Sequence, residues 1–172
     1  MQLTPTSYIV LGLLERTGEA TPYDLKQVVA ASVGNFWSVP HSQLYAEPER
    51  LARAGLLDER REPGGRHRRL FTLTGGGREA LDAWRHEPTE ELSELRDPGL
   101  LKLFFGGDVR ALAAVQRDTH RAKLASYEER RALDAGDEPR GPWHALVLDA
   151  RGERVWVRFW TELAGDDQAT RR

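Results

Sequence analysis

A run of basic side chains lies on both sides of a Pro-Gly-Gly segment in this sequence. It consists of Arg60, Arg61, Arg66, His67, Arg68 and Arg69, and Glu62 is the one acidic residue among them. Guanidinium groups stay charged at any cellular pH and match the oxygen geometry of phosphate. Charge runs on hairpins are nevertheless more often solvated edges that discourage strand pairing. The neighbouring sequence must decide whether this run binds an anion.

A second set of polar side chains precedes the basic run. They are His41, Ser42, Gln43 and Tyr45. All are hydrogen-bonding types that can contact base edges and phosphate oxygens of duplex DNA. The surrounding pattern predicts that they lie on a helix, with Ser38 as N-cap, Pro40 in the first turn and Gly55 as the left-handed end.

One residue conflicts with this helix. Pro48 lies inside it, where the missing N–H and the clash with the carbonyl of Leu44 would cost roughly 3 kcal/mol in a free helix. We therefore expect a kink at Pro48. Because Glu47 and Glu49 would repel phosphate, we expect DNA contacts to be confined to the first turns, residues 40–45.

The basic run lies on a predicted β-hairpin that follows the helix at once. Leu56 and Leu57 open the first strand, and Glu62-Pro63-Gly64-Gly65 predicts the turn. The second strand is expected over residues 66–73, with Phe71 and Leu73 on one face. A helix followed by a basic hairpin is the winged-helix arrangement that holds duplex DNA.

Two further helices are expected before this unit. Residues 3–16 are apolar on most sides, so we expect that helix to be buried, either within its own domain or by a second subunit. Thr21-Pro22 is a strong helix start, and that helix should run to about Ser32. Together with the helix from Ser38 onward they form a helix-turn-helix whose last member is the recognition helix.

The remaining chain is predicted to be helical. Thr74 should cap a helix over residues 75–86, whose three leading glycines lack the Lys-Ser/Thr of a phosphate-binding loop. The acidic, proline-containing residues 87–94 favour a linker, which divides the chain into residues 1–90 and 91–172. Further helices are expected over residues 99–105, 108–135 and 143–163; residues 155–160 also alternate like a strand, but the length of the pattern favours helix. The expected fold class is mainly α with a small β-hairpin.

Composition excludes several functions. The chain has 172 residues, a formal net charge of -2 and a pI near 6.2, so any affinity for nucleic acid must come from local charge. It has no cysteine, and its five histidines form neither an i,i+4 pair nor an HExxH motif. We therefore expect no enzymatic activity, no cofactor and no metal. No apolar segment is long enough to span a bilayer, which predicts a cytoplasmic protein.

Several motifs together resemble the PadR family of bacterial transcriptional regulators, and the likeness covers most of the chain. They are SYIVLGLL, TPYDLKQ, SQLY...RLARAGLL, GRHRRLFTLT followed by GREALDAW, and LLKLFFGG. The resemblance implies a winged-helix DNA-binding domain, dimerisation through the C-terminal helices and the first helix, and repression relieved by a small effector. It places Ser42, Gln43 and Tyr45 at the DNA-facing end of the recognition helix, and Arg66, Arg68 and Arg69 on the wing. Phe71, where the family often has tyrosine, and the Glu47-Pro48 pair depart from the family pattern.

These observations predict a dimeric transcriptional regulator that binds an inverted-repeat DNA site. The alternative is a winged-helix module for protein interaction, which should expose apolar anchors rather than arginine on the wing. A small planar aromatic effector could stack on an indole, and the candidates are Trp84, Trp143, Trp156 and Trp160. Aromatic residues at helical spacing are more often core or dimer contacts, and this alternative stays open.

Overall fold

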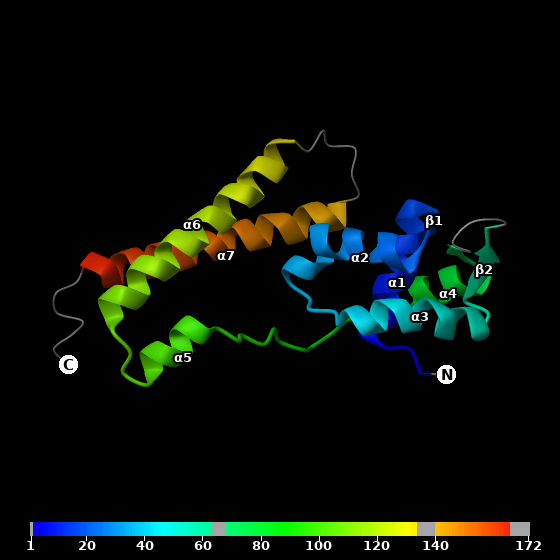
Figure 1. Cartoon of the computed structure of the whole chain (residues 1–172), viewed down its shortest axis with the longest axis horizontal. Coiled ribbons are helices and arrows are strands. Elements are labelled where there is room, and N and C mark those ends of the chain that lie inside the picture. The colour runs from blue at the N-terminus through cyan, green and yellow to red at the C-terminus, as the bar shows by residue number, and fades with distance from the viewer. Residues whose placement is uncertain (1, 63–67, 134–139, 166–172) are drawn as a thin grey trace. The chain divides into compact units, whose positions relative to one another are not determined.

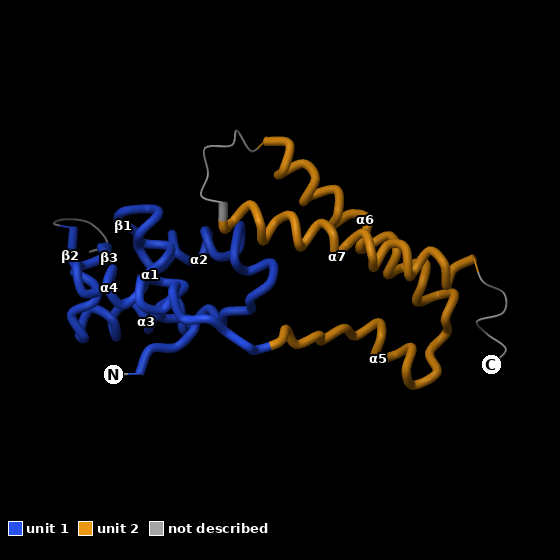
Figure 2. Tube along the Cα trace, turned by 180° about the vertical axis from the view of Figure 1, so that it is seen from behind, with its two compact units in different colours: residues 1–91 blue, residues 92–172 orange. Residues whose placement is uncertain are grey.

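The structure is a computed structural model that describes residues 2–62, 68–133 and 140–165, and these residues form helices and one small sheet (Figure 1). The chain divides into two compact units, Met1–Glu91 and Leu92–Arg172 (Figure 2). The expected class, mainly α with a small β element, is confirmed. None of the described helices combines the length and apolar character needed to span a membrane.

The first unit begins with two helices that start at capping boxes. Helix α1, Pro5–Thr17, is capped by Thr4, whose hydroxyl accepts from the backbone N–H of Ser7. Helix α2, Pro22–Ala31, starts at the predicted Thr21, and the short 3-10 helix η1, Val33–Asn35, follows it. The Thr21 side chain and backbone donate hydrogen bonds to Asp24, which lower the pKa of that carboxyl despite its partial desolvation. Local sequence signals therefore set where both helices begin.

Helix α3, His41–Arg53, begins later than its expected start at Ser38. The residue before a proline is forced toward an extended conformation, so the chain can enter the helix only after Pro40. The helix ends as predicted, with Gly55 at a φ of 75°. Pro48 lies inside α3 with its ring fully buried. The kink at Pro48 remains a prediction.

The sheet has three antiparallel strands in the order β1-β3-β2. Strand β2, Leu57–Arg61, pairs with β3, Arg69–Leu73, and Leu57 lies opposite Leu73. Strand β1, Glu19–Ala20, pairs with the other edge of β3. The sequence does not predict this strand, because two residues are too few to show an alternation of apolar and polar side chains. The predicted start of β3 at Arg66 lies outside the described residues. Phe71 and Leu73 are buried, as the alternation predicts.

The core of the first unit lies between the helices and one face of this sheet. Every element of the unit except η1 contributes to it. Its buried apolar residues are Val10, Leu11, Leu13, Leu14, Ala20, Leu25, Val29, Leu44, Leu51, Leu57, Phe71, Leu73 and Leu81. Helix α1 supplies four of these side chains, so its own unit buries most of its apolar surface and a second subunit is not required for that purpose.

Helix α4, Gly75–His86, has the bounds and the Thr74 cap predicted from the sequence. The third of its leading glycines, Gly77, is buried against Leu56 and Leu73. A Cβ atom on Gly77 would lie 2.2 Å from the carbonyl oxygen of Leu56 and 2.7 Å from Cδ1 of Leu73. Glycine at this position allows α4 to approach the start of the hairpin closely.

The second unit contains helices α5, Pro98–Phe104, α6, Val109–Ala132, and α7, Arg140–Gly165. Helices α6 and α7 pack against each other, and α5 contacts α6 (Figure 1). Residues 155–160 belong to α7, so helix and not strand is confirmed there. The predicted end of α6 near residue 135 lies outside the described residues. Asp97 and Asp108 cap α5 and α6 through their carboxylates, at Leu100 and Ala111.

Candidate nucleic-acid interface

The first turns of α3 present a polar surface. Its side chains are those predicted to contact DNA, and all are exposed: His41, Ser42, Gln43 and Tyr45. Leu44 and Leu51, on the opposite side of the helix, are fully buried in the core. The apolar side therefore fixes the helix, and the polar side is free to hydrogen-bond with a ligand.

The expectation that Glu47 repels phosphate at the surface of α3 is wrong, because Glu47 is only 9% exposed. It accepts hydrogen bonds from Ser7 Oγ at 2.6 Å and from Arg50 at 2.5 and 2.9 Å, and Arg50 also donates to Ser7 Oγ at 2.9 Å. Burial alone would raise the pKa of Glu47, but the hydrogen bonds from Arg50 and Ser7 outweigh it and lower that pKa. The cluster of Ser7, Glu47 and Arg50 thus joins α3 to α1 by hydrogen bonds.

A second polar contact between α1 and α3 involves Gln43. The hydroxyl of Thr6, which is 8% exposed, donates to Oε1 of Gln43 at 2.9 Å. The sequence does not predict that Thr6 and Ser7 contact α3, because Gln43 and Glu47 lie far along the chain. The spacing of Thr4 and Ser7 predicts an N-terminal cap, whereas no short motif in this segment predicts a contact with α3.

Arg69, one of the predicted wing contacts, is held by carboxylates. Its guanidinium lies 2.7 Å from Glu59 and 3.1 Å from Glu49, and it stacks over the ring of Phe71. The hydrogen bonds to Glu59 and Glu49 raise the pKa of Arg69, while the same contact with Arg69 lowers the pKa of Glu59. Arg69 thus joins the hairpin to α3 in this structure.

The other described arginines of the hairpin differ in their surroundings. Arg60 pairs with Glu19 at 2.7 Å and Arg61 with Glu59 at 3.3 Å, so carboxylates offset the charge of these two arginines. Arg68 is exposed and forms no ion pair with any described carboxylate, although its charge contributes to lowering the pKa of Asp24. Arg66 and His67, also predicted contacts, lie outside the described residues.

The tryptophans predicted as effector contacts each have a packing partner. Trp84 stacks on Tyr8 in the first unit, with ring centroids 4.6 Å apart. In the second unit, Trp143 lies under Arg131, Trp156 stacks on His120, and Trp160 is fully buried against Phe159. These contacts favour the interpretation that the indoles are packing residues, and their role in effector binding remains a prediction.

A polar cluster lies between α6 and α7. His120 Nδ1 is 2.5 Å from Glu153, and Lys123 is 3.4 Å from the other oxygen of Glu153. Burial raises the pKa of the nearby Asp149. Within the described part of the chain, no group of three or more histidine and carboxylate side chains is arranged to hold a metal ion.

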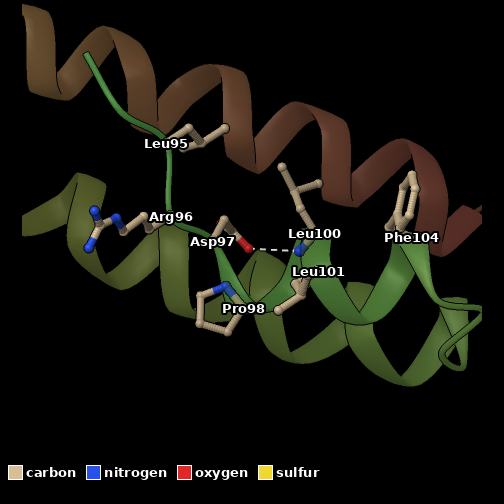
Figure 3. A pocket seen from close by; sticks show the side chains of 7 residues that line it. All are labelled: Leu95, Arg96, Asp97, Pro98, Leu100, Leu101 and Phe104. Carbon is tan, nitrogen blue, oxygen red and sulfur yellow. Dashed lines mark hydrogen bonds between the residues drawn. The ribbon is translucent and has the colours of Figure 1, made fainter.

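A hollow of about 540 Å³ lies beside α5 in the second unit. It is lined by Leu95, Arg96, Asp97, Pro98, Leu100, Leu101 and Phe104. Figure 3 shows Leu95, Leu100 and Phe104 pointing to the same side. Five of these seven residues are apolar, and Leu95 and Phe104 are 66% and 82% exposed, so the hollow is open to solvent.

Helices α2 and α3 with the β2–β3 hairpin define a winged helix, the class of fold found in many DNA-binding transcriptional regulators. Residues 10–83 match the transcriptional regulator PadR-like family. The negative transcriptional regulator PadR of Bacillus subtilis (strain 168) is 36% identical over 102 residues, which cover 57% of this chain and 54% of that protein. The chain thus matches about half the length of this curated relative.

Solved structures match over nearly the whole chain. Bacillus subtilis PadR in complex with operator DNA has a TM-score of 0.80 and 26% identity, covering 95% of this chain and 98% of that one. Bacillus subtilis PadR in complex with p-coumaric acid has a TM-score of 0.72 and 26% identity, covering 95% and 97%. In sequence over residues 10–83 and in fold, the chain is therefore similar to PadR-like transcriptional regulators.

Proposed function

We propose that this regulator binds duplex DNA as a homodimer and represses transcription until a small aromatic effector releases it. One observation carries the proposal: the first turns of α3 expose the hydrogen-bonding side chains of His41, Ser42, Gln43 and Tyr45 beside a hairpin that exposes Arg68. Side chains of the first kind read base edges in the major groove, and an arginine beside them binds phosphate. Bacillus subtilis PadR, which has a similar fold, forms a complex with operator DNA, and this supports DNA binding by the chain.

The alternative function, a protein-interaction module, has less support. A protein-binding wing should present apolar anchors, whereas residues 58–61 of β2 are charged and exposed. The repressor assignment follows the Bacillus subtilis relative, which is a negative regulator. Binding to the DNA upstream of the protein's own gene, titrated with salt, tests the proposal directly. Salt-insensitive binding, or none to any duplex, would contradict it.

Replacing Arg68 and replacing Arg69 should have different effects on the salt dependence of DNA binding. Arg68→Ala removes one phosphate contact, so the slope of log affinity against log salt should fall by about 0.9. Arg69→Ala should mainly loosen the wing from α3, because Arg69 is paired with Glu59 and Glu49. Fluorescence anisotropy with labelled operator, repeated across a salt series, measures the DNA affinity and the salt slope of each variant. Equal salt slopes in Arg68→Ala and the parent would remove Arg68 from the interface.

The exposed apolar side chains of the second unit support a dimer. Leu101, Phe104, Phe105, Val115, Leu148 and Val155 are each at least 60% exposed, and large exposed apolar areas mark protein interfaces. The hollow beside α5 offers a second subunit a place to pack. A two-fold dimer should bind an inverted repeat with half-site centres ~10 base pairs or a multiple apart.

Phe104→Asp should shift the protein toward monomer by placing a charge in this apolar interface. Sedimentation at micromolar concentrations measures the shift. Lys102→Glu is the matched control, because Lys102 is also exposed on α5 but lies two residues away, toward the opposite side of the helix. A Phe104→Asp protein that remains fully dimeric would exclude α5 from the interface.

The proposed effector is a small planar aromatic compound, as the PadR complex with p-coumaric acid suggests. Linkage requires that an inducer bind more weakly when operator is present, and couplings of about 1–3 kcal/mol are typical. The parent, Trp143→Phe and Trp160→Phe proteins are titrated with such compounds, with and without operator, while their intrinsic fluorescence is recorded. For an inducer, the binding constant obtained from the quenching should be lower when operator is present. A compound that quenches equally in both conditions is not an inducer.

We propose no catalytic activity for the chain, because residues 10–83 match a family of transcriptional regulators. We also place it in the cytoplasm, where a bacterial regulator meets its operator.

A further inference from the structure

The guanidinium group of Arg69 is held by carboxylates from two different elements. Glu59, on the neighbouring strand β2, accepts hydrogen bonds from Nε at 2.7 Å and from Nη2 at 2.8 Å. Glu49, on α3, accepts from Nη1 at 3.1 Å. Each of the three guanidinium nitrogens of Arg69 therefore donates to a carboxylate of this chain.

The two carboxylates have different effects on this side chain. The contact with Glu59 is bidentate, and two parallel hydrogen bonds fix both the plane and the direction of a guanidinium group. The contact with Glu49 is a single hydrogen bond that reaches from the hairpin to α3, and the Glu49 side chain is partly exposed. Glu59 thus orients the guanidinium of Arg69, and Glu49 occupies the nitrogen that Glu59 leaves free.

Glu49 lies at the edge of the polar surface of α3. It follows Ser42 by seven residues and Tyr45 by four, so the three side chains share one side of the helix. Ser42 and Tyr45 are exposed there. The Nη1 end of Arg69 is therefore directed to the border of the surface that we propose to face DNA, and Glu49 is the group that receives it.

We propose that Glu49 limits the affinity of this regulator for duplex DNA by occupying the Arg69 nitrogen that would otherwise donate to a phosphate. This inference rests on the proposed binding of DNA through α3 and the hairpin. A carboxylate offers a guanidinium group the same kind of oxygen acceptors as a phosphate. An arginine that left Glu49 for a phosphate would leave that carboxylate uncompensated beside a polyanion, which would repel it. The exchange therefore gains little, and the pair of Arg69 and Glu49 persists on DNA.

Glu49→Ala should release a phosphate contact that is already oriented. Glu59 still holds Nε and Nη2 in this variant, so Nη1 can donate to a phosphate with little further loss of side-chain freedom. The slope of log affinity against log salt should steepen by about 0.9, so a fourfold rise in salt should weaken binding about threefold more than in the parent. Because a phosphate contact carries no sequence information, an operator and an unrelated duplex should gain affinity by similar factors at low salt.

The experiment measures fluorescence anisotropy of the full-length proteins with two labelled duplexes of equal length, across a salt series. One duplex is the operator from upstream of the protein's own gene, and the other has a shuffled sequence. Arg69→Ala should leave the salt slope of the parent unchanged, and Glu49→Ala should no longer steepen the slope when Arg69 is absent. Asp58→Ala is the control for charge, because Asp58 is exposed on the same hairpin and forms no ion pair with any described cationic side chain. Its slope should match that of the parent.

Three results would overturn the role of Glu49 and leave DNA binding intact. The first is a salt slope that falls as far in Arg69→Ala as in Arg68→Ala, because Arg69 would then already bind a phosphate. The second is a Glu49→Ala slope that equals the parent's or steepens equally with and without Arg69. The third is a changed preference at one base pair, which would make Glu49 a base contact. Failure of the parent to bind any duplex would overturn both the inference and the proposed function. Circular dichroism melts confirm that each variant is folded.

Discussion

Gly77→Ala should destabilise the winged unit by about 3 kcal/mol, because the added methyl group has no space. The new Cβ atom would lie 2.2 Å from the carbonyl oxygen of Leu56, which cannot move freely since it accepts a hydrogen bond from the N–H of Thr74 at 3.2 Å. Relief would require α4 to move away from the hairpin. Urea denaturation followed by circular dichroism measures the loss.

The neighbouring glycine provides the matched control. A Cβ atom on Gly76 would make contacts of 3.8–3.9 Å, which are ordinary van der Waals distances. Gly76→Ala should therefore be neutral or stabilise α4 by about 0.5–1 kcal/mol through the lower backbone entropy of alanine. Equal unfolding free energies for the Gly76→Ala and Gly77→Ala proteins would contradict the close packing of α4 on the hairpin.

Glu47→Ala should destabilise the same unit by about 2 to 3 kcal/mol. The substitution leaves the buried Ser7 hydroxyl without its acceptor and Arg50 without its counter-charge. The Arg50 side chain is 32% exposed, so water relieves part of the penalty. Glu49→Ala is the control, since Glu49 is 46% exposed and its single ion pair with Arg69 should contribute about 0–1 kcal/mol. Similar losses of unfolding free energy in the Glu47→Ala and Glu49→Ala proteins would show that the contacts of Glu47 do not stabilise the packing of α3 on α1.

The same cluster predicts a pH dependence with a definite sign. The pKa of Glu47 is lower in the folded state than its ordinary value of 4.5. A depressed carboxyl pKa stabilises the fold at pH values above the unfolded pKa, and this contribution is lost as pH falls through the folded value. The stability difference between the parent and Glu47→Gln should therefore be largest above about pH 5 and shrink in more acidic buffer. A difference that stays constant or grows on acidification would refute the assignment.

The parts of the fold that local chemistry determines could be predicted from the sequence. Thr21 and Thr74 are N-caps whose partners lie three residues away, so the starts of α2 and α4 follow from short motifs. The alternation of Phe71 and Leu73 likewise assigned the buried face of β3. The polar residues at the start of α3 could also be identified, because their exposure follows from the burial of Leu44.

Contacts between distant segments could not be predicted. Ser7 and Glu47 are far apart in sequence, so Glu47 looked like a surface carboxylate when only its own helix was considered. The arginine run looked strongly cationic for the same reason, since Glu19 and Glu49 lie outside it. Strand β1 forms only because β3 offers it a free edge. Such pairings depend on the tertiary fold, and neither the hydrophobic periodicity nor a short sequence motif predicts them.

The carboxylates beside the wing arginines also affect how this regulator would search a genome. Non-specific attachment to DNA depends on the phosphate charges that a protein neutralises. Arg60, Arg61 and Arg69 are already paired within the protein, so among the described arginines of the hairpin Arg68 is the one left to attract arbitrary sequences. We expect short residence times on unrelated DNA and a large freely diffusing pool. Operator occupancy would then depend mainly on base contacts from α3, and few copies per cell would suffice.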